Sequence, residues 1–423
     1  MHINQLKMDM SSSKQALIYN FVEKTYFMTN YSIKKISSKT LFTTLALFCV
    51  LLTNAQEKKE SGLDKFVEYF TFYPNKEKVA KDSSLYLSKI ITAPIISYSP
   101  QTSLGFGVGA KYLFKFKGSG DETRTSNMPV SFLYTLNNQF FIFSGFEIFT
   151  NQEKWVISGN IRFQNYPRYF YGIGRNTPET NEEIYDTFQF LIEPILLKRV
   201  FTRYLFVGGG FRYNKIYDTN VKYNGLLDTN RPQGFDGSTS TGLELALLYD
   251  SRDNILNASK GWYFEFTRGF YDTSLGGTQN FDLTRFDLRH YIKISQKNDD
   301  VIAFQAIGHF ANGDVPLSEL ALFGNDKIMR GYLKGRFIEE NMLAAQVEYR
   351  KTFKDSRFGL VAFLGAGDVF NTSKELSLSD LKLNYGVGLR FMLDKKEKLN
   401  LRFDFGSGNE TDGNLYINIA EAF

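Results

Sequence analysis

The last ten residues alternate between two kinds of side chain, and this alternation limits the folds open to the chain. Counting back by twos from the terminal Phe423 gives Glu421, Ile419, Ile417 and Leu415, which are mostly apolar. The interleaved positions are small or polar. A strand with one apolar and one polar face suits a wall between lipid and a watery lumen. The segment therefore predicts a membrane strand that ends at Phe423.

The same alternation recurs from about residue 91, in segments bounded by turn-forming residues. In one of them Leu401, Phe403 and Phe405 alternate with Arg402 and Asp404. A soluble β-sandwich would also alternate, but with shorter strands. The expected strands lie at residues 91–98, 103–117, 128–137, 139–149, 153–165, 184–199, 201–215, 238–250, 261–273, 280–296, 299–311, 341–354, 358–370, 383–394, 397–406 and 413–423. These are sixteen, an even number, as expected of a bacterial single-chain barrel. The sequence thus predicts an all-β fold, a 16-stranded antiparallel transmembrane β-barrel over residues 91–423.

Composition agrees with a barrel whose rims carry aromatic belts. Aromatic residues make up 16% of the 423-residue chain, with 41 Phe and 25 Tyr. This is far more than a soluble core needs, and membrane interfaces are enriched in such residues. The formal charge of +5 is too small to argue for nucleic acid binding. After Leu52 no stretch is apolar enough for a transmembrane helix.

The N-terminus predicts export. Three lysines at positions 34, 35 and 39 precede the apolar residues 41–52, and Ala55 is followed by Gln56. A basic segment, a short apolar segment and a small residue are the signature of a secretory signal peptide. A short buried helix is the competing interpretation, and translation could start at Met1 or Met28. The expected organisation is a leader and signal peptide over residues 1–55, a short periplasmic lead-in over 56–90, and the barrel. The only cysteine, Cys49, falls in the signal peptide.

Loop lengths predict the orientation of the barrel. If both barrel ends are periplasmic, every even-numbered connection is a short turn, and the sequences at these connections are compact and polar. The long insertions, at about 166–183, 216–237 and 312–340, all fall on odd-numbered connections. They are therefore expected on the exterior of the cell.

The most specific motif, Arg330-Gly331-Tyr332, lies in the longest of these connections. Here the sequence resembles the BamA/TamA family of outer-membrane barrels (the bacterial surface antigen superfamily), in a reduced form without POTRA domains. The resemblance implies that the sixth external loop folds into the lumen and that this motif pins it to the wall. Glu348 matches the carboxylate that receives the arginine. Gly365 stands where the family has an aspartate, so Arg330 is expected either to rely on Glu348 alone or to use Asp368 as a substitute carboxylate from a shifted position.

Other short segments are also similar to this family. They are Tyr169 to Gly174 in the third external loop and Asp250 to Asp253 with Gly261 near a periplasmic turn. The terminal Phe423 matches the family's C-terminal assembly signal. Asp250 and Asp253 could instead bind calcium, although turn chemistry explains them more simply.

The resemblance implies a factor for protein insertion or translocation in the Gram-negative outer membrane. Pro94 in the first strand removes a ladder donor and predicts a weak seam with the last strand. Expected partners are outer-membrane lipid, the barrel-assembly machinery that inserts the chain itself, and client outer-membrane or secreted proteins. The alternative is a passive or gated pore for small solutes, with a lumen lined by Arg285, Asp287, Arg289, Lys293, Glu348, Arg350 and Arg402.

Enzymatic activity is not expected. The segment after the predicted signal peptide has two histidines, His290 and His309, and no nucleophile elbow accompanies either. His309 lies near Ser318 in the sequence. No catalytic residue, cofactor or metal ligand is predicted.

Overall fold

The computed structural model describes residues 69–82, 85–99, 103–120, 122–295, 300–354, 356–394 and 398–423. All of them belong to one compact unit, Phe66–Phe423. The predicted signal peptide, Cys49 and both candidate start residues lie outside the described residues. Among the described residues, no helix has the length and apolar character needed to cross a bilayer.

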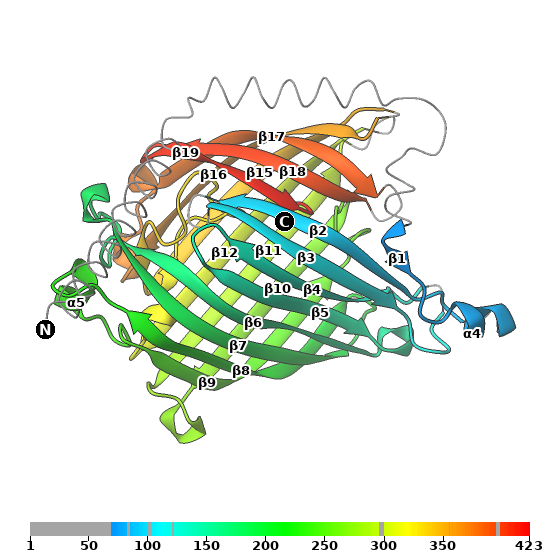
Figure 1. The fold of residues 1–423 in the computed structure, drawn as a ribbon, viewed down its shortest axis with the longest axis horizontal. Coiled ribbons are helices and arrows are strands. Elements are labelled where there is room, and N and C mark those ends of the chain that lie inside the picture. Colours follow the sequence, from blue (N-terminus) through cyan, green and yellow to red (C-terminus); the bar gives the residue numbers. More distant parts are fainter. Residues whose placement is uncertain are drawn as a thin grey trace, which may run out of the picture. The chain divides into compact units, whose positions relative to one another are not determined.

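Sixteen long strands follow one another around the unit (Figure 1). They are β2 (Lys89–Ser99), β3 (Ser103–Phe114), β4 (Ser126–Thr135), β5 (Phe140–Phe149), β6 (Trp155–Phe170), β7 (Glu183–Arg199), β8 (Leu205–Asn220), β9 (Ser238–Asp250), β10 (Gly261–Tyr271), β11 (Phe281–Lys293), β12 (Val301–Gly313), β15 (Asn341–Thr352), β16 (Phe358–Phe370), β17 (Lys382–Asp394), β18 (Leu399–Gly408) and β19 (Thr411–Ile419). Each corresponds to one predicted strand, so the predicted fold class is confirmed.

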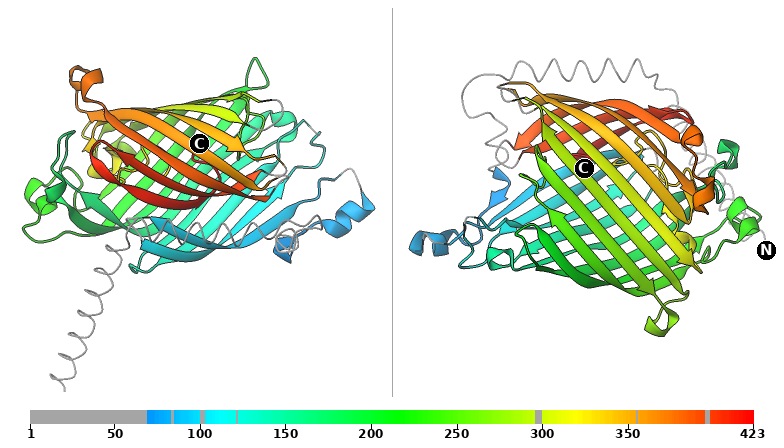
Figure 2. Two further views of the ribbon diagram at one scale, coloured as in Figure 1. Left: turned by 90° about the horizontal axis from the view of Figure 1, so that it is seen from above. Right: turned by 180° about the vertical axis from the view of Figure 1, so that it is seen from behind.

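Every strand pairs antiparallel with the next, and the order of pairing returns to its start. β9 pairs with β10 from Asp250–Tyr263 onward, and β19 pairs with β2 through Ile417 and Tyr98. Figure 2 shows the strands tilted around a common axis, as closure of a sheet into a barrel requires.

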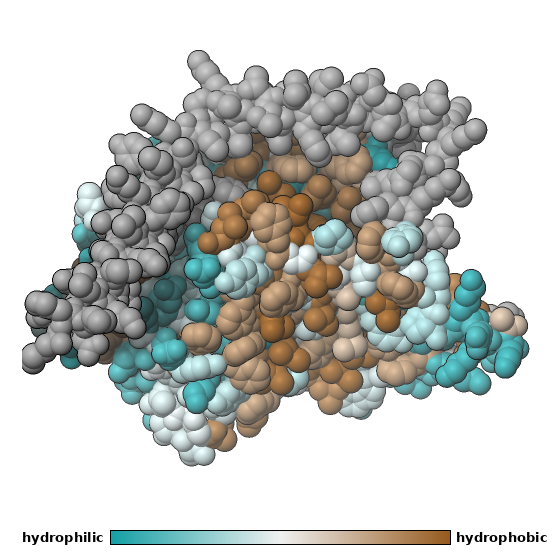
Figure 3. All heavy atoms as spheres, viewed as in Figure 1, coloured by the Kyte–Doolittle hydropathy of each residue, from teal (hydrophilic) through white to brown (hydrophobic). Residues whose placement is uncertain are grey.

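The barrel separates lipid-facing from lumenal side chains by simple alternation. On β18 the polar residues Arg402 and Asp404 are buried, whereas Phe405 is 46% exposed. Apolar side chains are also exposed on other strands, among them Phe106, Phe132, Leu196, Leu245, Leu364 and Val387. Figure 3 shows that such residues form an apolar band across the middle of one face, with hydrophilic residues towards the strand ends. This is the surface expected of a membrane-spanning barrel.

The longest connections lie together at one end of the barrel, because they follow its fifth, seventh and eleventh strands, which are β6, β8 and β12. The β8–β9 connection contains α5 (Leu226–Asn230), and the β12–β15 connection contains the short strands β13 (Ala321–Leu322) and β14 (Ile338–Glu339). Residues of the β12–β15 connection are buried, among them Phe323, Ile328, Met329, Tyr332 and Phe337.

A short lead-in precedes the barrel and meets the free edge of β2. It contains β1 (Thr71–Phe72) and α4 (Lys76–Lys81). β1 pairs with Ile90 and Ile91 of β2, and the Thr92 amide donates to the Phe70 carbonyl at 2.9 Å. The edge of β2 is therefore covered near its start.

The end of the chain differs from the sequence prediction. The last strand ends at Ile419 rather than at Phe423, because Ala420 has φ +75° and turns the backbone out of the ladder. Phe423 is only 6% exposed, and the views in Figures 1 and 2 place the C-terminus within the barrel outline. The alternation through Glu421 suggested a longer strand, but the last four residues leave the wall.

Candidate functional site: a loop tip held inside the barrel

The tip of the β12–β15 connection is bound to the inner wall by Arg330. Its guanidinium donates to Glu348 Oε2 on β15 at 2.5 Å and to Asp404 Oδ2 on β18 at 2.7 Å. All three side chains have 0% exposure. The guanidinium carbon also lies 3.5 Å from the ring centroid of Phe363 on β16. Charge pairing and stacking together satisfy a buried cation.

The carboxylates that hold Arg330 are shared with neighbouring arginines. Glu348 Oε1 accepts from Arg350 Nε at 2.7 Å. Asp404 accepts from Arg390 Nη1 at 2.5 Å and from Arg402 Nη1 at 3.0 Å. This network surrounds the tip with alternating charges, which is the arrangement that buried ions require.

Gly331 brings the backbone of the tip against the wall. It has φ +115°, and a Cβ at this position would lie 2.8 Å from the Ser407 amide nitrogen of β18. Its carbonyl accepts from Thr411 Oγ1 at 2.8 Å and from Asn414 Nδ2 at 2.6 Å, both on β19. Its amide donates to the Tyr416 hydroxyl at 3.2 Å. Only glycine allows this conformation and this close approach.

Tyr332 and Asp326 extend these contacts along the same strands. The Tyr332 hydroxyl donates to the Leu383 carbonyl at 2.9 Å, next to Asn409 Oδ1 at 2.7 Å. Asp326 Oδ2 accepts from Arg402 Nη2 at 2.8 Å and from Asn418 Nδ2 at 3.1 Å. The tip therefore contacts the last five strands, β15 to β19.

Asp368 does not serve as the substitute carboxylate for Arg330. It pairs instead with Arg175 of the β6–β7 connection. Glu348 lies opposite Phe363 on β16, and Asp368 is five residues further along that strand, a rise of roughly 16 Å. It is therefore too far along the wall, and Asp404 on β18 is the second partner.

The β6–β7 connection lies against the same loop. The Gly174 amide donates to the Ile338 carbonyl at 2.8 Å. Arg336 donates to the Thr177 carbonyl at 3.0 Å, and its guanidinium lies 4.7 Å from the Tyr171 ring centroid. The segment that includes Tyr169 to Gly174 thus braces the loop that carries Arg330.

The wall partners Asp404, Arg390, Arg402 and Tyr416 were absent from the predicted site. The alternation on β18 does place Arg402 and Asp404 towards the lumen, which was the available signal. It could not show which lumenal position lies at the height of Arg330, because this depends on the stagger between strands that are distant in sequence.

The other candidate residues have structural contacts. Asp250 accepts from Arg124 Nη1 at 2.7 Å and from Arg252 Nε at 2.9 Å. Asp253 accepts from the Ser259 amide at 2.8 Å. The contacts with Arg252 and Ser259 are the turn chemistry favoured by the sequence, and the contact with Arg124 joins this turn to the β3–β4 connection. In the part of the chain that the structure describes, no group of three or more His, Cys, Asp or Glu residues could hold a metal ion.

The histidines contact groups other than a serine. His309 Nε2 lies 2.9 Å from the Glu319 carbonyl, and the Ser318 hydroxyl lies 2.9 Å from the Ser238 hydroxyl. The His290 ring stacks on Trp262 with centroids 3.8 Å apart. These contacts do not bring His309 and Ser318 together as a base and nucleophile.

Phe423 is buried in a small cluster with Ala258, Tyr291, Val301, Ala303 and Ala422. Its terminal oxygen accepts from Arg350 Nη2 at 2.9 Å, and the Arg350 guanidinium lies 5.0 Å from its ring centroid. The C-terminus is thereby joined to Arg350, which also holds Glu348.

Comparisons with known proteins agree with this architecture. The crystal structure of BamA from Haemophilus ducreyi lacking POTRA domains 1-3 matches with a TM-score of 0.52 and 14% identity, covering 79% of this chain and 70% of that one. CdiB from Acinetobacter baumannii matches with a TM-score of 0.49 and 13% identity, covering 79% and 59%. No curated protein matches. The model of the Omp85 superfamily domain matches residues 115–423, which is most of the chain, and the protein therefore belongs to the Omp85 superfamily.

Proposed function

We propose that this barrel inserts or exports client proteins by opening between its first and last strands. The observation that carries the proposal is the contrast between this seam and the other ladders. β6 pairs with β7 along its whole length, from Trp155 to Phe170. Within the described residues, β19 and β2 form one register pair, Ile417 with Tyr98.

The sparse pairing leaves part of β2 available to another strand. Among the described residues, no register pair covers its outer edge from Ala93 to Ser97. An open edge presents unpaired backbone groups that can add a strand from another chain. Pro94 lies within this stretch and lacks a donor. A client strand would therefore find backbone acceptors along this edge, with little existing pairing to displace.

The loop tip supports the proposal by holding β19 from the lumen. Gly331, Tyr332 and Asp326 all contact β19 side chains. These contacts hold the last strand in place, although its edge facing β2 makes one register pair with that strand among the described residues. We infer that the pinned loop keeps the wall intact around a seam that can open.

The barrel belongs to the Gram-negative outer membrane, as its superfamily indicates. The proposed route there is the N-terminal signal peptide, with assembly guided by Phe423 and the cell's barrel-assembly machinery. Proposed partners are outer-membrane lipid and client outer-membrane or secreted proteins. The fold is similar to that of BamA, and this similarity motivates the proposal.

A solute pore is the competing function. Several of its predicted lumenal residues are paired: Arg285 with Glu244, Arg289 with Asp287, and Arg402 with Asp326. The loop residues Phe323, Met329 and Tyr332 also occupy the lumen. A lumen that is partly occupied by this loop favours insertion over free conduction.

The test is client insertion into liposomes. The purified chain is reconstituted, an unfolded outer-membrane barrel is added from urea, and protease-protected, heat-modifiable client is measured with time. We expect faster insertion than into empty liposomes and into liposomes that carry an unrelated closed barrel. Equal rates in all three, across several clients, would remove the proposal.

A further inference from the structure

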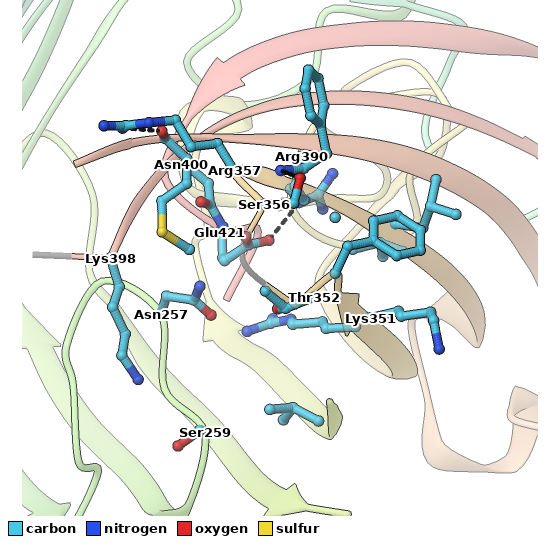
Figure 4. Close-up of a pocket in the computed structure, with 18 of the residues that line it drawn as sticks. Asn257, Ser259, Lys351, Thr352, Ser356, Arg357, Arg390, Lys398, Asn400 and Glu421 are labelled. Carbon is cyan, nitrogen blue, oxygen red and sulfur yellow. Dashed lines mark hydrogen bonds and ion pairs between the residues drawn. The ribbon is translucent and has the colours of Figure 1, made fainter. Parts of the chain in front are cut away.

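A cavity of roughly 350 Å³ lies at the end of the barrel that carries the short connections. Its walls come from the β9–β10, β15–β16 and β17–β18 connections and from the chain's C-terminal tail. Figure 4 shows Arg390, Asn400 and Glu421 grouped together, with Asn257 and Lys398 on a neighbouring side. The cavity is separate from the loop tip, although Arg350 and Arg390 reach both.

Two buried arginines that line this cavity each keep one nitrogen without a hydrogen-bond partner among the described residues. Arg350 Nη1 and Arg390 Nη2 have no hydrogen-bond partner within the described part of the chain. The two residues are 5% and 4% exposed. Their other nitrogens are occupied, because Arg350 contacts Glu348 and Phe423, and Arg390 contacts Asp404 and Glu421. A buried donor without a partner is costly and indicates a missing acceptor.

The lining is strongly cationic. The basic residues are Arg350, Lys351, Lys354, Arg357, Arg390 and Lys398, and Glu421 is the acidic residue among those described. Glu421 is already engaged, since it accepts from Arg390 Nε at 2.8 Å and from Asn400 Nδ2 at 2.7 Å. Lys351 lies 3.9 Å from Asp300. The remaining positive charge favours an anion.

We propose that this cavity binds a phosphoryl group, either as free phosphate or as the headgroup of an anionic phospholipid. Arg350 and Arg390 line the cavity, and guanidinium groups are well suited to the oxygens of a phosphoryl group. Lys354 and Lys398 add positive charge from the β15–β16 and β17–β18 connections. A divalent cation does not fit this lining, because the site offers donors and positive charge. The site would receive its ligand from the short-connection end.

Binding is tested with the full chain in zwitterionic detergent and phosphate-free buffer. Isothermal titration uses inorganic phosphate in one arm and monomeric short-chain phosphatidylglycerol in the other, with short-chain phosphatidylcholine as the uncharged reference. Saturable binding of both anions supports a general phosphoryl site. Binding of phosphatidylglycerol alone assigns the site to lipid. Binding of neither anion overturns the proposal.

The variant Lys354→Gln/Lys398→Gln removes charge from the rim without touching the partners of Arg330. We expect it to weaken anion binding roughly tenfold, since two charged contacts are lost. The charge-matched control, Lys117→Gln/Lys154→Gln, changes two exposed lysines on other short connections and should bind as the wild type does. Equal affinities of the rim variant and the control would contradict the assignment.

A second variant tests the inner donors. Arg390→Lys keeps the charge but removes the unpartnered Nη2. If the barrel remains heat-modifiable, phosphate binding should fall while the charge of the cavity is unchanged. Unaltered affinity in a folded Arg390→Lys protein would exclude this donor from the site. If the variant does not fold, the rim variant still decides the question.

Discussion

Ile417 on β19 pairs with Tyr98 on β2, which places a residue near the end of the last strand opposite one near the end of the first. The two strands run antiparallel, so this register offsets them along the barrel wall. β1 covers β2 near its start at Ile90 and Ile91. The middle of the β2 edge is thus bounded by the lead-in on one side and by β19 on the other.

The loop tip and the seam share a strand. Gly331 accepts hydrogen bonds from Thr411 and Asn414 of β19, while Arg330 joins β15 and β18. Freeing the tip should therefore affect both the filling of the lumen and the position of the last strand.

Replacing Arg330 with alanine should destabilise the barrel by about 3 kcal/mol, at the lower end of values for breaking a buried ion pair. The loss is moderated because Arg350, Arg390 and Arg402 continue to compensate Glu348 and Asp404. The temperature at which heat-modifiable migration is lost measures the effect. The control is Arg231→Ala, whose guanidinium pairs with Asp228 while its side chain is 67% exposed, and which should change little. Equal behaviour of both variants would show that Arg330 is not a pin.

Gly331→Ala should destabilise the tip through both strain and collision. A positive φ costs a non-glycine residue about 1 kcal/mol, and the new Cβ would also meet the Ser407 amide nitrogen at 2.8 Å. Gly276→Ala provides the control, since Gly276 has φ +90° with nothing within 4 Å of the added Cβ. Denaturant unfolding should show a larger loss for Gly331→Ala. Matching losses would mean that the close approach to β18 is unimportant.

Ion conduction should be small and fluctuating in the wild type, because buried residues of the β12–β15 connection occupy part of the lumen. In planar bilayers, Arg330→Ala should raise the frequency and size of the open events, whereas Arg231→Ala should not. A large constant current from the wild-type barrel would instead favour the pore.

The β9–β10 turn should become less stable in acid through Asp253. Burial raises the pKa of this carboxyl, but hydrogen bonds from the Ser259 hydroxyl and the amides of Ser259 and Lys260 outweigh it and hold the pKa below its usual range. Because the folded pKa is the lower one, the stabilisation is complete above the unfolded pKa and is lost as pH falls through the folded value. Asp253→Asn should reduce thermal stability at pH 7 and much less at pH 3. An equal reduction at both pH values would exclude ionisation as the cause.

The sequence was sufficient for the strands because barrel walls are encoded locally. Alternation such as Leu401, Arg402, Phe403, Asp404 identifies a strand and its lumenal face without knowledge of its neighbours. The departure of Phe423 from the wall was not predictable in this way. It depends on the positive φ at Ala420 and on a binding partner, Arg350, from β15.

The site was predictable only in part, for a related reason. Arg330 stands out because it lies in the Arg330-Gly331-Tyr332 motif. Glu348 stands out because the alternation of its strand places it on the side facing the lumen. Asp368 is also a carboxylate on the barrel wall. Only its position along β16 shows that it pairs with Arg175 and not with Arg330. Strand stagger and loop path are properties of the closed barrel, so a list of lumenal residues cannot give them.

The most direct test of the proposed opening between β2 and β19 joins these two strands by a disulfide. In a Cys49→Ala background, Tyr98→Cys/Ile417→Cys places two thiols on directly paired residues, whose Cα separation suits a disulfide. The control, Ala345→Cys/Ala366→Cys, cross-links a register pair within the continuous β15–β16 ladder. We predict that oxidation abolishes client insertion only in the seam variant and that reduction restores it. Full insertion by the oxidised seam variant, with the cross-link verified, would contradict the proposed opening between β2 and β19.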